Sequence, residues 1–128
     1  MVTINKNGNK AYYEQLVLSI KEDILQGILQ PGDRIPSVRE MAKQLLMNPN
    51  TVSKAYKVLE AEQVLVTVKG KGTFVRESGE LPRNELRIQQ LREQLNDLVV
   101  EARHLQVTSE ELIGWVQAAE EKLGGHER

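Results

Sequence analysis

Apolar residues between positions 10 and 28 recur every three or four residues, which is the spacing of one helical face. The members of this stripe are Tyr13, Leu16, Val17, Ile20, Ile24 and Ile28. Charged and amide side chains fill the positions between them, so the pattern predicts an amphipathic helix over residues 10–28. Gly27 and the dipeptide Pro31-Gly32 then indicate a helix stop and a turn.

Two further helix starts follow closely on one another. Ser37 and Glu40 have the spacing of a capping box, in which each side chain accepts a hydrogen bond from the other residue's backbone. This predicts a second helix from Ser37 to about Leu46. Asn48 is a favoured N-cap, and Pro49 falls at the first helical position, where its missing N–H does no harm. A tight turn therefore joins the second helix to a third.

The third helix has two different ends. Val52, Ala55, Tyr56 and Leu59 form a buried stripe at helical spacing, whereas residues 48–51 carry mainly short polar side chains. A polar first turn does not help to build a core. This end of the helix is therefore available to contact another molecule.

A change of period after Glu62 predicts a β-hairpin. Residues 64–68 and 73–76 are rich in β-branched side chains, and the sequence Lys69-Gly70-Lys71-Gly72 lies between them. Residues 77–82 have no periodicity and are interpreted as a linker.

The remaining residues predict a helical hairpin. The apolar positions of its first helix alternate in steps of three and four, as in a helix that packs on a helical partner. They are Ile88, Leu91, Leu95, Leu98, Ala102 and Leu105. Thr108 and Glu111 form a second capping box, and Leu112, Val116, Ala119 and Leu123 extend the next helix to Gly124-Gly125.

These elements predict a mainly α-helical protein with two domains. Residues 1–76 form a domain of three helices and a hairpin, residues 77–82 form a linker, and residues 83–128 form a two-helix antiparallel hairpin.

Charge is distributed unevenly between these parts. Residues 34–76 contain eight Lys/Arg and three Asp/Glu, whereas residues 77–128 contain six and eleven, within a total net charge of −1. A basic middle indicates a part that binds a polyanion, although an uneven spread of solvated side chains is the alternative.

Composition excludes several other classes of protein. The chain has no cysteine, which excludes disulfides and thiol chemistry. It has no apolar run of about 20 residues and no apolar centre in the N-terminal segment, so we expect no membrane span and a cytoplasmic location.

Enzymatic groups are also missing. His104 and His126 each lack a second ligand at helical spacing, and adjacent carboxylates such as Glu110-Glu111 do not converge on one substrate. The glycine-bearing turn at residues 69–72 is too short for a phosphate loop. We therefore expect no catalysis, no metal and no cofactor.

The order of the elements is that of a winged helix-turn-helix. In this arrangement the third helix enters the major groove, while the preceding helix and the hairpin, or wing, contact the DNA backbone. The predicted DNA-binding residues are Asn50, Thr51, Ser53 and Lys54 of the third helix and the wing lysines Lys69 and Lys71. Each alone is also explained as a cap, turn or surface residue, and their joint order favours DNA.

The stretch PGDRIPSVREMAKQLLMNPNTVSKAYKVLE and the later GKGTFV resemble the N-terminal domain of GntR-type bacterial transcription regulators. The short helical tail resembles the YtrA subfamily, which implies dimerisation through the two helices. Carried onto this chain, the family's DNA contacts fall on Arg39, Asn50, Thr51, Ser53, Lys69 and Gly70, with Ser37 as a phosphate contact. The resemblance implies a homodimer on a palindromic operator, repressing a nearby operon.

Three positions depart from the family pattern. Leu46 and Gln63 stand where the family usually has glycine, and these positions often take positive φ. Pro49 stands where relatives often have arginine, so base reading from that position is not expected.

Two questions stay open from the sequence. The rival function is a winged helix that binds protein rather than DNA, although such a module does not need the basic balance of residues 34–76. A small-molecule effector has little room within two helices, which leaves a site between subunits or between domains. Trp115 is a candidate for lining such a site, with helix packing as the alternative.

Overall fold

The computed structural model describes residues 2–77 and 82–124. The chain divides into two compact units, the first of which ends at residue 78. Most of the predicted linker, residues 78–81, lies outside the described residues. Within the described residues, no helix is long and apolar enough to cross a membrane.

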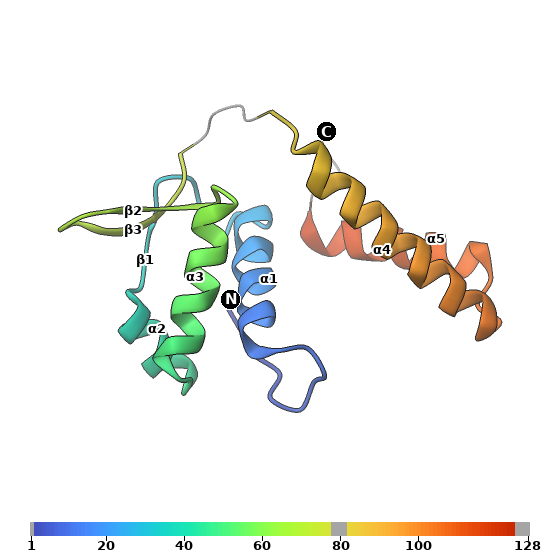
Figure 1. Cartoon of the computed structure of the whole chain (residues 1–128), viewed down its shortest axis with the longest axis horizontal. Coiled ribbons are helices and arrows are strands. Elements are labelled where there is room, and N and C mark those ends of the chain that lie inside the picture. Colours follow the sequence, from blue (N-terminus) through green and yellow to red (C-terminus); the bar gives the residue numbers. More distant parts are fainter. Residues whose placement is uncertain (1, 78–81, 125–128) are drawn as a thin grey trace. The chain divides into compact units, whose positions relative to one another are not determined.

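The first unit contains three helices and a small antiparallel sheet with the strand order β1-β3-β2 (Figure 1). Its elements are α1 (Tyr12–Leu25), β1 (Arg34–Ile35), α2 (Val38–Leu45), α3 (Pro49–Ala61), β2 (Leu65–Val68) and β3 (Gly72–Val75). Helix α3 packs against α1, α2 and β2. This is the winged helix-turn-helix that the sequence predicts.

One apolar core holds the first unit together. It takes residues from all three helices and all three strands, and the apolar stripe of α3 lies at its centre. The buried members are Leu16, Val17, Ile20, Ile35, Met41, Ala42, Val52, Ala55, Tyr56, Leu59, Leu65 and Val75. Beside this core, an ion pair of 2.6 Å between Lys21 Nζ and Glu62 Oε1 connects α1 to the end of α3.

The sequence did not predict strand β1, and it placed the end of α1 too late. Strand β1 has only two residues, Arg34 and Ile35, which pair with Phe74 and Thr73 of β3. Two residues are too few to show a period. Helix α1 ends at Leu25 rather than residue 28 because the chain leaves the helix before Gly27, which has φ = +81°. Ile28, predicted in the buried stripe, is consequently 50% exposed.

The predicted caps and turn are confirmed. Both capping boxes form, at Ser37 with Glu40 and at Thr108 with Glu111. The Asn48 side chain accepts a hydrogen bond from the Asn50 N–H at 2.8 Å, and Pro49 is the first residue of α3.

The two expected glycine sites do have positive φ. Leu46 has φ = +55° and Gln63 has φ = +63°. Leu46 ends α2 in a left-handed cap in which the Met47 N–H donates to the Ala42 carbonyl at 2.9 Å. Lys6 Nζ also donates to the Leu46 carbonyl at 3.0 Å, so the N-terminal segment supports this turn.

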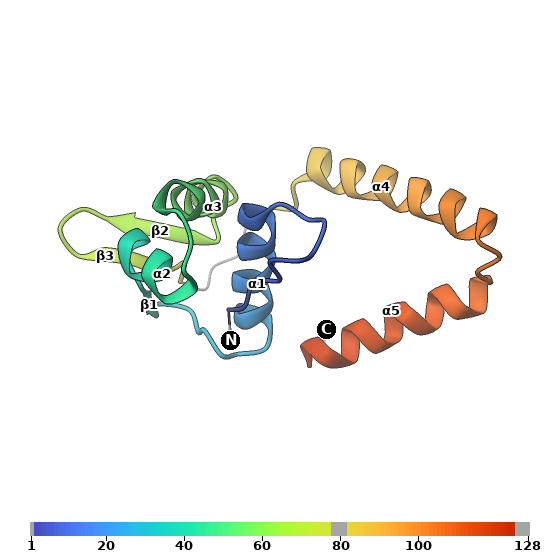
Figure 2. The ribbon, with the colours of Figure 1, turned by 90° about the horizontal axis from the view of Figure 1, so that it is seen from below.

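The second unit consists of α4 (Glu85–His104) and α5 (Ser109–Leu123), which diverge from the turn between them (Figure 2). Ala102, beside this turn, is the one buried apolar residue of the predicted stripe, and Ile88 and Leu112 are half-buried. The other members are exposed: Leu91, Leu95, Leu98, Leu105 and Val116. The predicted stop at Gly124-Gly125 is described as far as Gly124, which caps α5 with φ = +65°.

We expect Leu46→Gly to raise the free energy of unfolding by about 0.5 to 1 kcal/mol, because glycine adopts the left-handed conformation without strain. The Leu46 side chain is 80% exposed, so little burial is lost. Urea denaturation followed by circular dichroism measures the change. The control is Lys43→Gly, within α2, which we expect to destabilise the protein by about 1 kcal/mol. Equal destabilisation by both variants would contradict the assignment of strain to Leu46.

Candidate nucleic-acid interface

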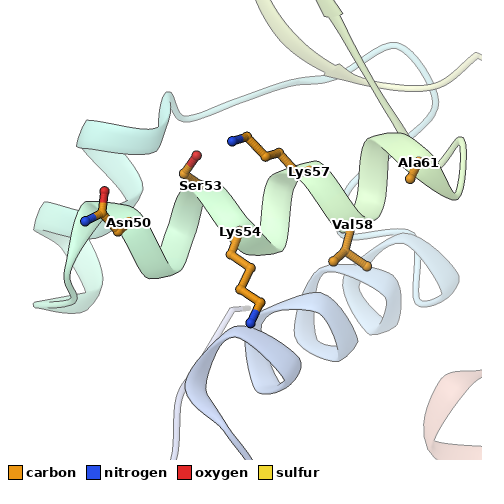
Figure 3. Close-up of a pocket in the computed structure, with 6 residues that line it drawn as sticks. All are labelled: Asn50, Ser53, Lys54, Lys57, Val58 and Ala61. Atoms are coloured by element: carbon orange, nitrogen blue, oxygen red, sulfur yellow. The ribbon is translucent and has the colours of Figure 1, made fainter.

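Helix α3 presents a polar face to solvent because its apolar stripe fixes the opposite face in the core. Val52, Ala55 and Leu59 are fully buried, which sets the rotation of the helix. The outer face forms a shallow hollow of about 480 Å³ (Figure 3). Its lining residues are Asn50, Ser53, Lys54, Lys57, Val58 and Ala61. Thr51, also predicted for this site, is half-buried in the first turn.

The two lysines of this face differ in their surroundings. Lys54 Nζ lies 4.0 Å from the centre of the Tyr13 ring of α1, a cation–π contact, and Figure 3 shows the side chain directed towards α1. Lys57 is exposed and points to the other side of α3 with Ser53. Lys57 was not among the residues predicted from the sequence, although its spacing of four from Ser53 and seven from Asn50 puts all three on one face.

The N-terminus of α2 contributes a second group of polar residues. The Ser37 hydroxyl accepts a hydrogen bond from the Glu40 N–H at 3.2 Å, and Glu40 Oε1 accepts one from the Ser37 N–H at 2.8 Å. The Ser37 backbone N–H lowers the pKa of the Glu40 carboxyl group most of all, and the Ser37 side chain lowers it further. Ser37 therefore acts first as a cap, while Arg39 in the first turn of α2 is exposed.

A hydrogen bond in the core fixes this part of α2 relative to α3. The Tyr56 hydroxyl donates to the Pro36 carbonyl at 2.7 Å, immediately before the Ser37 cap. Burial raises the pKa of Tyr56, and the Glu40 carboxylate adds a further increase. The phenol thus stays protonated and remains a donor at neutral pH.

The wing supplies a third group. Its tip is a tight turn in which the Lys71 N–H donates to the Val68 carbonyl at 2.9 Å and Gly70 has φ = +78°. Lys69 and Lys71 are exposed on this turn. Arg34 of β1 lies beside it, with Nε donating to the Lys71 carbonyl at 3.3 Å. Arg34 is thus a cation beside the wing that was not among the residues predicted from the sequence.

The described residues contain no group of three or more His, Cys, Asp or Glu side chains that could hold a metal ion. The notable feature of the first unit is instead polar and basic side chains on three elements, α2, α3 and the wing. Cations and short polar groups at these places suit contacts to DNA phosphates and base edges.

Fold and surface together define the class of protein: a winged helix-turn-helix DNA-binding protein. The family is defined by the match of residues 12–75 to the model of bacterial regulatory proteins of the gntR family. The chain belongs to the GntR family of DNA-binding transcription regulators, a family without enzymatic activity. Membership favours DNA over the rival protein-binding module.

Individual relatives match over 73% to 100% of the chain. The HTH-type transcriptional repressor YtrA of Bacillus subtilis is 40% identical over 117 residues, which cover 91% of this chain and 90% of the repressor. A crystal structure described as a transcriptional antiterminator from Listeria monocytogenes is 37% identical, with a TM-score of 0.91 and coverage of 100% and 96%. The YtrA protein of Sulfolobus acidocaldarius is 36% identical, with a TM-score of 0.59 and coverage of 73% and 97%. The predicted resemblance to YtrA-like members is confirmed.

We expect Tyr56→Phe to lower the free energy of unfolding by about 1 to 2 kcal/mol, because the Pro36 carbonyl loses its donor. Denaturant unfolding measures the change. The matched control is Tyr12→Phe, which removes an exposed hydroxyl that donates to the Lys6 carbonyl at 3.3 Å, and we expect less than about 0.5 kcal/mol there. The hydrogen bond to Pro36 would be unimportant if both variants matched the wild type.

Proposed function

We propose that this protein is a homodimeric transcriptional repressor that binds a palindromic operator and controls a nearby operon. One observation carries most weight: α2, α3 and the wing all present polar or basic groups away from the core, in a protein of a DNA-binding family. The YtrA relative of Bacillus subtilis, similar along nearly its whole length, is itself a repressor. We also propose that the protein acts in the cytoplasm.

In this proposal α3 enters the major groove. Asn50, Ser53 and Lys57 share its outer face and are placed to meet base edges or phosphates. Thr51 extends this surface at the first turn. Lys54 contributes charge from the Tyr13 side, at the edge of the surface.

The other proposed contacts are to the DNA backbone. Arg39 and the Ser37 cap approach it from the N-terminus of α2, and Lys69, Gly70 and Lys71 approach it from the wing. Most protein–DNA hydrogen bonds go to phosphate and sugar, and these fix the register in which a recognition helix reads bases. Charge neutralisation at these contacts makes binding strongly dependent on salt.

The tail supplies the reason for a dimer. Between α4 and α5 lies an apolar groove of about 520 Å³, the tail groove. Its lining residues are Leu95, Leu98, Val99, Ser109, Leu112, Ile113, Trp115, Val116 and Ala119. Most of these side chains are more than half exposed in a single chain, and a soluble protein rarely leaves so large an apolar surface in water.

A second copy of the same two helices is the proposed occupant of the tail groove. Apolar residues at steps of three and four along α4 match the spacing that helix pairs need. A symmetric dimer carries two recognition helices, which suits half-sites separated by one turn of DNA or more. A site for an effector between subunits is compatible with this arrangement.

We expect Arg39→Ala to weaken operator binding by about 1 to 3 kcal/mol, because a backbone or base contact of the guanidinium is lost. Fluorescence anisotropy with a duplex selected from random DNA, at fixed salt, gives the affinity. Lys43→Ala, another exposed cation on α2, is the control, and we expect a smaller effect. An affinity of Arg39→Ala equal to that of the wild type would remove Arg39 from the interface.

We expect Leu95→Asp and Leu98→Asp each to give a monomer, since a carboxylate would be buried in the dimer seam. Sedimentation velocity reports the oligomeric state. Leu25→Asp replaces a leucine of α1 that is also more than half exposed, and it should leave the dimer intact.

The single tryptophan offers an independent measurement of the same equilibrium. Trp115 is 56% exposed in one chain, so its emission should shift to shorter wavelength as the dimer forms and covers it. A dimer that persists in both aspartate variants would place the interface elsewhere.

A further inference from the structure

Arg34 is an exposed cation on β1, at the edge of the sheet beside the wing. Its backbone pairs with Phe74 in the middle of β3, and its side chain runs along that strand towards the wing tip. There the Nε–H donates to the carbonyl of Lys71 at 3.3 Å. A guanidinium has five N–H donors, and the four on Nη1 and Nη2 are not used by this hydrogen bond.

The wing leaves a path for this side chain at Gly72. A Cβ atom at position 72 would lie 2.6 Å from Arg34 Nε, which is closer than atoms pack. Gly72 also has φ = +127°, a conformation that other residues rarely adopt. The absence of a side chain at this position thus allows Arg34 to reach the tip.

Arg34 also acts on the N-terminus of α2. The pKa of Glu40 is lowered chiefly by its hydrogen bonds from Ser37, and the positive charge of Arg34 adds a smaller decrease. Arg34 precedes the Ser37 cap by only three residues, so the chain itself also keeps it close to the start of α2. Strand β1, which carries Arg34, is followed in the chain by α2 with Arg39. It also pairs with β3 of the wing, whose turn carries Lys69 and Lys71.

We propose that Arg34 binds a phosphate of the DNA backbone between the N-terminus of α2 and the wing, and at the same time positions the wing tip through the Lys71 carbonyl. This inference rests on the proposed function. The planar guanidinium binds phosphate with two parallel N–H donors, which a lysine does not do. Because the contact is to phosphate, it strengthens binding to all duplex sequences and not to the operator alone.

The test compares Arg34→Ala and Arg34→Lys with the wild type in the full-length protein. Arg76→Ala is the matched control: it also removes an arginine next to β3, but at the opposite end from the wing tip, where Arg76 Nη1 donates to Gln63 Oε1 at 2.8 Å. Two duplexes of equal length are used, one selected by the protein from random DNA and one scrambled. Affinity is measured by anisotropy over a series of salt concentrations, and thermal unfolding checks that each variant is folded.

We expect Arg34→Ala to weaken binding to both duplexes by a similar factor, about 5-fold or more, and to reduce the slope of log K against log salt by about 0.9 per protomer. Arg34→Lys should keep the wild-type slope while losing affinity, because charge is retained and the two-donor geometry is not. Arg76→Ala should leave the slope unchanged. A slope for Arg34→Ala equal to that of the wild type overturns the phosphate contact, even if affinity falls.

Neutral methylphosphonates, placed one at a time in the selected duplex, provide a second measurement. At one position the methylphosphonate should weaken DNA binding by the wild type but not by Arg34→Ala, and this position identifies the phosphate. If no position behaves in this way, the inference is wrong. A wild-type protein that binds neither duplex at low salt would overturn the proposed function itself, whereas tight wild-type binding with no coupling to Arg34 overturns only the role of Arg34.

Discussion

The first unit depends on the burial of one face of α3. Val52, Ala55 and Leu59 are inaccessible to water, and α1, α2 and the sheet all pack around them. Burying a side chain such as Leu or Val stabilises a protein by roughly 1.5 to 3 kcal/mol, so this stripe strongly resists rotation of the helix. Because 3.6 residues make one turn, fixing the inner face also fixes the outer one, where Asn50, Ser53 and Lys57 lie.

Polar interactions then set the details that apolar packing leaves free. The Tyr56 hydroxyl holds Pro36 and hence the start of α2, while the left-handed cap at Leu46 sets the angle at which α3 begins. The N-terminal segment supports this turn through Lys6. In the sheet, the Arg34 side chain passes Gly72, which has no side chain, and contacts the Lys71 carbonyl of the wing. Each interaction is local, and together they place α2, α3 and the wing relative to one another.

The second unit differs from the first, because the apolar side chains between its helices are largely exposed instead of buried in a core. The helices α4 and α5 diverge, and Leu95 and Leu98 are 54% and 56% exposed. Burial of the tail groove is therefore available to stabilise a contact with another molecule, which we propose to be a second copy. In that case dimerisation and DNA binding are linked, because two DNA-binding domains that each bind weakly bind tightly when they are joined in one dimer.

Much of this protein follows from short-range sequence signals. The capping boxes, the Asn48-Pro49 start of α3 and the wing turn were all predicted, because each depends on a few neighbouring residues. The polar first turn of α3 was predicted for the same reason, whereas Lys57, two turns further along, was not among the predicted residues. The positive φ at Leu46 and Gln63 was expected instead from the resemblance to a family with glycine at these positions.

Only the tertiary structure decided which of those polar residues face solvent and which are engaged elsewhere. Lys54 lies over the Tyr13 ring, and Arg34 lies beside the wing on a two-residue strand. Those contacts join residues 41 and 37 positions apart, and no local pattern encodes them. The sequence by itself thus determined the helices, caps and turns, because these form between neighbours. The fold decided the surroundings of each charge, because those depend on packing between distant segments.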